Sequence, residues 1–160
     1  MHPERTLILV KPDAIQRGLI GDIISRFEKK GLKIVGMKMM SLDEAVLREH
    51  YAHISDKPFF PGLSQFMMSS PVIAICIEGL DCVDAVRRIT GITKAREAEA
   101  GSIRGDFAMS VSCNVVHASD SIENAAKEVP RFFKSDETYK YQKSEYEHVY
   151  AEEELEAMGG

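Results

Sequence analysis

The alternation of hydrophobic and polar positions predicts strands separated by amphipathic helices. Residues 6–10 form a short β-rich run, 32–40 alternate in polarity, and 72–77 are continuously apolar, which is typical of a strand buried on both faces. A fourth, short strand is expected at 114–117. Apolar residues at helical spacing predict helices at 20–30, 44–54, 63–67, 82–89 and 122–129. Pro12 is expected to end the first strand, Gly31 to end the first helix, and Ser41 with Glu44 to form a capping box.

The order of these elements indicates an α+β fold. It predicts a ferredoxin-like βαββαβ sandwich, a four-stranded, mainly antiparallel sheet with helices packed on one of its faces. Residues 1–150 are expected to form a single domain, and residues 151–160 an acidic, flexible C-terminal tail. The ferredoxin-like fold hosts many functions, so the fold alone does not identify the chemistry.

Composition narrows the class of protein. The chain has 160 residues, of which 44% are hydrophobic and 28% charged, so disorder and coiled coils are not expected. No apolar run approaches the ~20 residues needed to span a bilayer, and the N-terminus lacks a signal-peptide pattern. We therefore expect a cytoplasmic protein without a membrane partner. The net charge of −5 predicts a poor generic binder of nucleic acid, because non-specific affinity comes from cations that neutralise phosphates, and it leaves a local basic pocket open. No specific nucleic-acid partner is expected.

Metal-binding patterns are weak in this sequence. The three cysteines form no C-x-x-C pair and are expected to be reduced thiols. His50 and His53 lie three residues apart on a predicted helix and could share a metal ion. No third ligand clusters with them in the sequence, and a solvated or half-buried histidine is the commoner alternative.

The sequence contains none of the common nucleotide-binding motifs. His117 is its strongest candidate for a catalytic residue. It ends a predicted strand and precedes a helix N-terminus, where free N–H groups favour anions. An imidazole is mostly neutral at pH 7 and can attack phosphorus without a separate base. Ser119 and Asp120 can organise the turn, and Glu128 can reach back toward the ring. An ordinary strand-end histidine beside a helix cap remains the alternative.

A phosphate site also needs cations, and four are placed at element ends or in loops: Lys11, Arg87, Arg88 and Arg104. Gly105 next to Arg104 permits a close backbone approach. Each cation taken alone is typical of a solvated surface charge, and the spacing does not establish that they converge.

Several separate motifs, in order, make the sequence similar to the nucleoside diphosphate kinase family. The resemblance runs without an obvious gap from about residue 4 to residue 133. It rests on Glu4-Arg5-Thr6, Lys11-Pro12-Asp13, Gln16-Arg17-Gly18-Leu19, Glu49-His50-Tyr51, Pro58-Phe59-Phe60, Ile103-Arg104-Gly105-Asp106-Phe107 and Asn114-Val115-Val116-His117-Ala118-Ser119-Asp120-Ser121.

The resemblance implies an enzyme that transfers the γ-phosphate of a nucleoside triphosphate, mainly ATP, to a nucleoside diphosphate. The transfer is expected to be ping-pong, through a phosphohistidine at His117, with broad base specificity. The family's other catalytic positions match Lys11, Tyr51, Ser119 and Glu128. Its nucleotide-binding positions match Lys11, Phe59, Arg87, Thr93, Arg104, Val111 and Asn114.

The resemblance also implies a Mg²⁺ cofactor, held by nucleotide phosphates and water rather than by protein ligands, and a homohexamer or a tetramer. Three positions depart from the family pattern: Ala95 and Ala100 stand where proline is usual, and Ala118 where glycine is usual. A non-catalytic nucleotide-sensing module and a histidine phosphatase that releases phosphate to water are the alternative functions.

Overall fold

The computed structural model describes residues 2–158 and contains a four-stranded sheet. The strands lie in the order β2-β3-β1-β4, and every neighbouring pair is antiparallel. Their bounds are β1 Glu4–Val10, β2 Lys33–Met40, β3 Val72–Gly79 and β4 Val116–Ala118. The ferredoxin-like α+β prediction is confirmed, and β4 begins two residues later than the sequence suggested.

Eight α-helices and four 3₁₀ turns connect and cover the strands within the described residues. The helices are α1 Pro12–Gln16, α2 Ile20–Lys30, α3 Glu44–His50, α4 Phe60–Met68, α5 Cys82–Thr90, α6 Ile103–Phe107, α7 Ile122–Phe132 and α8 Glu152–Ala157. The 3₁₀ turns are Ala52–Ile54, Ala95–Glu97, Ser135–Glu137 and Ser144–His148. None of the helices in residues 2–158 is long and apolar enough to cross a membrane.

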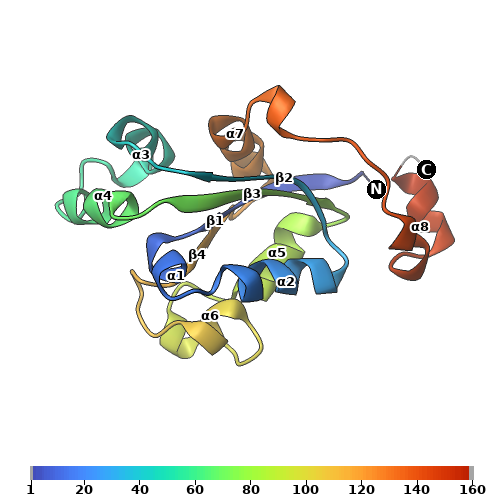
Figure 1. Cartoon of the computed structure of the whole chain (residues 1–160), viewed down its shortest axis with the longest axis horizontal. Coiled ribbons are helices and arrows are strands. Elements are labelled where there is room, and N and C mark those ends of the chain that lie inside the picture. Colours follow the sequence, from blue (N-terminus) through green and yellow to red (C-terminus); the bar gives the residue numbers. More distant parts are fainter. Residues whose placement is uncertain (1, 159–160) are drawn as a thin grey trace.

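Helices cover both faces of the sheet, so the expectation of a single covered face is wrong. Helices α3, α4 and α7 lie on one face, and α1, α2, α5 and α6 lie on the other (Figure 1). Leu7 and Leu9 of β1 face the first layer, while Ile8 and Val10 face the second. The continuously apolar β3 requires this arrangement, because both of its faces are removed from water.

Local signals fixed most element boundaries. Strand β1 ends at Val10, and Pro12 is the first residue of α1, where its missing N–H is tolerated. Helix α2 ends at Gly31, whose φ of +96° favours glycine. The prediction that Ser41 caps this helix is wrong. The Asp43 carboxylate caps α3 instead, by accepting a hydrogen bond from the Val46 N–H at 2.9 Å.

The C-terminal segment crosses the outer edge of β2 before it ends in α8. The Tyr139 N–H donates to the Val35 carbonyl at 2.8 Å, so the segment pairs with one end of this edge strand. Residues 152–157 of the acidic tail are helical, and Gly159 and Gly160 lie outside the described residues.

Candidate active site

A cavity of about 1160 Å³ gathers most of the residues that the sequence singled out for chemistry. Ser119 is fully buried and does not line the cavity itself, but its hydroxyl contacts Glu128, which does. Ten others line the cavity directly, although they come from α5, α6, β4, α7 and several loops. They are Lys11, Tyr51, Phe59, Arg87, Thr93, Arg104, Val111, Asn114, His117 and Glu128.

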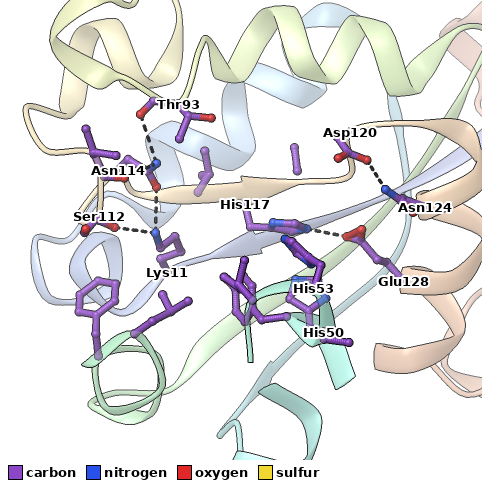
Figure 2. Close-up of a pocket in the computed structure, with 18 of the residues that line it drawn as sticks. Lys11, His50, His53, Thr93, Ser112, Asn114, His117, Asp120, Asn124 and Glu128 are labelled. Atoms are coloured by element: carbon purple, nitrogen blue, oxygen red, sulfur yellow. Dashed lines mark hydrogen bonds and ion pairs between the residues drawn. The ribbon is translucent and has the colours of Figure 1, made fainter. Parts of the chain in front are cut away.

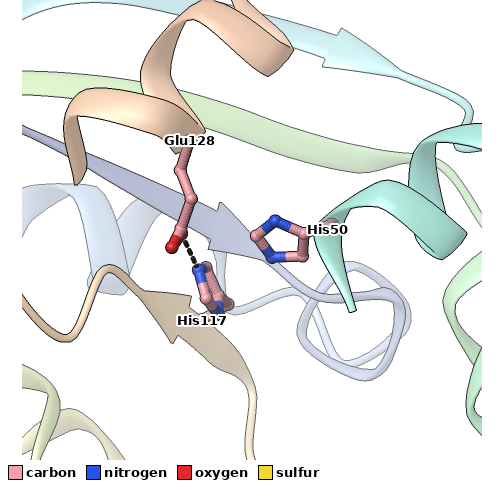
Figure 3. A group of neighbouring side chains, drawn as sticks. All are labelled: His50, His117 and Glu128. Carbon is pink, nitrogen blue, oxygen red and sulfur yellow. Dashed lines mark hydrogen bonds and ion pairs between the residues drawn. The ribbon is translucent and has the colours of Figure 1, made fainter. Parts of the chain in front are cut away.

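His117 sits in the centre of β4 and pairs with Leu9 of β1. Its Nε2 lies 2.6 Å from Oε1 of Glu128 on α7 (Figure 3). A carboxylate can only accept a hydrogen bond, so in the neutral ring Nε2 carries the proton and Nδ1 carries the lone pair. The geometry therefore selects Nδ1 as the nucleophilic nitrogen.

Ser119 fixes the carboxylate that orients the histidine. Its hydroxyl donates to Oε1 of Glu128 at 3.2 Å and accepts from the Leu7 N–H at 3.3 Å. Ser119 is fully buried and Glu128 nearly so. The carboxylate is thus held by both the β-sheet and the imidazole, which limits its rotation.

A strained turn precedes the histidine. Val115 has a φ of +65°, and the Val116 N–H donates to the Asn114 carbonyl at 2.8 Å, which makes a γ-turn of the rare form. A β-branched residue in this region is an outlier. The Asp13 carboxylate holds the turn by accepting from the Val115 N–H at 3.0 Å. Such strain clusters at functional sites, where the surrounding structure enforces it.

Lys11 and Asn114 form a polar network beside the histidine (Figure 2). The Lys11 ammonium donates to the Ser112 carbonyl at 2.7 Å and to Oδ1 of Asn114 at 2.9 Å. Asn114 in turn donates to the carbonyls of Val111 and Thr93. Burial lowers the pKa of Lys11 to about 8, with Asp13 opposing this shift and Arg104 adding to it.

Two arginines complete the cationic side of the cavity. Arg104 is only 4% exposed and donates to the carbonyls of Gly91, Asn114 and Val116, so it ties the loops around the site together. Burial lowers the pKa of Arg104 to about 10, which leaves it charged at neutral pH. Arg87 donates weakly to the Ala118 carbonyl at 3.4 Å. Three of the four candidate cations, Lys11, Arg87 and Arg104, therefore converge on the cavity, whereas Arg88 does not line it.

The mouth of the cavity is apolar and exposed. Phe59 is 58% exposed and Val111 is 53% exposed, and both line the opening. Tyr51 is more enclosed, and burial raises the pKa of its hydroxyl to about 12, so the hydroxyl stays protonated. Apolar groups at the mouth and cations inside suit a ligand with a flat apolar end and an anionic end.

Sequence spacing paired His50 with His53 and did not single out Arg131. His50 is 8% exposed, and its ring packs edge-to-face against His117 with centroids 4.5 Å apart. Arg131 donates to Nδ1 of His50 at 3.0 Å, and burial lowers the pKa of His50 to about 2. The expectation of a solvated or half-buried His50 is wrong. His50 is spaced at helical intervals from the apolar Leu47 and Ile54, and this spacing is the sequence signal that predicts a buried side chain.

The family model described as nucleoside diphosphate kinase matches residues 4–138. The chain belongs to the nucleoside diphosphate kinase family. It is 50% identical to a nucleoside diphosphate kinase of Parabacteroides distasonis over 95% of this chain and 99% of that protein. It is 44% identical to nucleoside diphosphate kinase B of Canis lupus familiaris over 93% and 98% of the two chains.

Solved structures agree with this assignment. A halophilic nucleoside diphosphate kinase from Halobacterium salinarum, in complex with CDP, superposes with a TM-score of 0.91 at 45% identity and covers 94% of this chain and 100% of that one. The predictions of a nucleotide-binding kinase and of an enzyme are confirmed. The non-catalytic nucleotide sensor is not favoured.

Proposed function

We propose that His117 accepts the γ-phosphoryl group of a nucleoside triphosphate on Nδ1 and passes it to a nucleoside diphosphate. The hydrogen bond between Nε2 of His117 and Glu128 carries this proposal, because it leaves the lone pair on Nδ1. Ser119 holds the carboxylate, which keeps the proton on Nε2 and stabilises the positive charge that the ring gains when Nδ1 bonds to phosphorus.

Each half-reaction exchanges one bond to phosphorus. The Nδ1 lone pair attacks the γ-phosphorus, an N–P bond forms, and the bond to the β,γ-bridging oxygen breaks as the diphosphate leaves. A second diphosphate then attacks through a terminal β-oxygen, the N–P bond breaks, and the lone pair returns to Nδ1. Donor and acceptor use one site in turn, which predicts ping-pong kinetics.

The cavity supports roles for the nucleotide-binding residues. Lys11, Arg87 and Arg104 supply positive charge for the phosphates, and Thr93 adds a hydroxyl. Asn114 is the candidate ligand for the ribose. Phe59 and Val111 can hold any base by stacking and apolar contact, which predicts broad base specificity. Burial, with a smaller contribution from the Glu128 charge, raises the pKa of Tyr51. From the family resemblance, we propose that Tyr51 supports the catalytic lysine.

The residues on the phosphate side fit a metal ion carried by the nucleotide. They offer cations, an amide and a hydroxyl, while the Glu128 carboxylate is engaged by His117 and Ser119. Mg²⁺ bound through phosphate oxygens and water would add charge neutralisation to that of Lys11 and the arginines.

We also propose that residues 1–150 form one domain with an accessory tail, and that the protein is a cytoplasmic homohexamer, with a tetramer as the alternative.

Initial rates with ATP and GDP test the proposal. Varying one nucleotide at several fixed concentrations of the other should give parallel double-reciprocal lines, since the phosphoenzyme forms before the acceptor binds. Intersecting lines would contradict the phosphohistidine route. Steady phosphate release from ATP alone would instead favour the phosphatase alternative.

A further inference from the structure

Three side chains at the nucleophile form a set that transition metals bind in other proteins. One ring nitrogen each of His50 and His117, and a carboxylate oxygen of Glu128, lie within 4.8 Å of one another (Figure 3). Two histidines and a glutamate are a recognised zinc ligand set that keeps an open fourth position. The sequence pairs His50 with His53, whereas the fold brings it to His117.

An ion on this set would disable the proposed mechanism. A metal on Nε2 of His117 would replace the proton that Glu128 holds there. A neutral imidazole keeps one N–H, so the proton would move to Nδ1 and remove the lone pair that attacks phosphorus. This consequence rests on the proposed function, whereas the affinity of the three side chains for an ion does not.

Arg131 opposes metal binding at both nitrogens of His50. A guanidinium only donates, so the 3.0 Å contact with Nδ1 uses the lone pair of that nitrogen. In the neutral ring Nε2 then carries the proton, and Nε2 is buried without a partner among residues 2–158. His50 therefore offers no free lone pair to an ion. A histidine that binds a metal normally donates its other N–H to a carboxylate or carbonyl, which is the reverse arrangement.

The position of Arg131 is itself supported. Its side chain is 14% exposed, and the Glu49 carboxylate lies 3.4 Å from its Nε, close enough for an ion pair. Its positive charge also repels a cation. We infer that Arg131 keeps transition-metal ions off the His50, His117 and Glu128 set by holding the proton of His50 on Nε2.

Titration of the nucleotide-free full chain with Co²⁺, followed by visible absorption, tests this inference. Zn²⁺ calorimetry provides a second measurement. A free thiol can bind these metals and that of Cys113 is exposed, so Cys113→Ser is the parent for every variant. Arg131→Glu supplies an acceptor for an Nδ1–H, and Arg131→Met only removes the donor. We expect both to bind Co²⁺ more tightly than the parent, by about 10-fold or more, with Arg131→Glu the tighter.

Two comparisons decide the outcome. His50→Phe added to Arg131→Glu should abolish the gain, while His53→Gln in the same background should leave it. The inference is overturned if the parent binds as tightly as the variants, or if either folded variant gains nothing. Far-ultraviolet circular dichroism checks folding, and Arg131→Met keeps the apolar stem should Arg131→Glu unfold. The titration needs no phosphotransfer, so its failure is distinct from an absence of His117 labelling by ATP.

Discussion

At the scale of single residues, the orientation of His117 depends on a carboxylate and a hydroxyl. Glu128→Ala removes the acceptor from Nε2, so the proton can reside on either nitrogen and the ring can rotate. We expect the rate of His117 phosphorylation by ATP, measured in a single turnover, to fall by about 10²-fold or more. Ser119→Ala leaves the carboxylate in place and should cost less. Equal losses in the two variants would contradict the proposed division of roles.

Lys11 makes the free enzyme sensitive to alkaline pH. Its pKa is lowered to about 8 in the folded chain from the usual 10.5, so the ammonium is lost as the pH rises through 8. We expect kcat/KM, which reports the free enzyme, to fall above about pH 8. The unfolded chain binds this proton more tightly, so the contribution of Lys11 to stability rises between pH 8 and 10.5. A kcat/KM that stays flat to pH 10, or that falls only together with the melting temperature, would argue against this role.

At the scale of elements, the loop before α6 contains a turn that suits proline. The Ser102 N–H donates to the Glu99 carbonyl, and Gly101 has a φ of +95°, whereas Ala100 has no positive φ. Ala100 thus occupies the second position of a type II turn, where proline is common. Ala100→Pro should raise the free energy of unfolding by about 0.4–1 kcal/mol. Gly101→Ala should lower it, although open space surrounds that position.

Thermal and urea unfolding of the two variants check this expectation, and phosphotransfer should barely change in either. A lower free energy of unfolding in Ala100→Pro would show that the turn differs from the one described. The third departure from the family pattern, Ala118, needs no compensation, because it lies in β4 and has no positive φ.

Sequence patterns predicted strands and helices well where a local signal acts alone, as at Pro12 and Gly31. They failed where a long-range contact decides. The start of β4 was placed too early because the γ-turn at Val115 is held by Asp13, about a hundred residues away. His50 was left outside because its partner Arg131 comes from α7. The convergence of Lys11, Arg87 and Arg104 could be predicted only from the family resemblance, because the spacing of residues along the chain carries no information on tertiary contacts.

At the scale of the whole molecule, the edge strand β2 is only partly covered. The C-terminal segment pairs with it at Val35, while Met37 and Met39 remain 54% and 59% exposed. An edge strand with apolar side chains favours pairing with another chain. If copies of this chain pair there, replacing both methionines by lysine should lower the native mass measured by light scattering. An unchanged mass would place the contacts between copies elsewhere.

The proposed mechanism requires His117 to carry the phosphoryl group on Nδ1. Incubation with γ-labelled ATP and Mg²⁺ should give a protein-bound label that acid releases and alkali does not, and GDP should discharge it as GTP. Phosphorus NMR of the labelled chain should report a phosphohistidine substituted at Nδ1, and His117→Ala should take up no label. Label retained in His117→Ala, or a phosphoryl group found on Nε2, would contradict phosphoryl transfer through Nδ1 of His117.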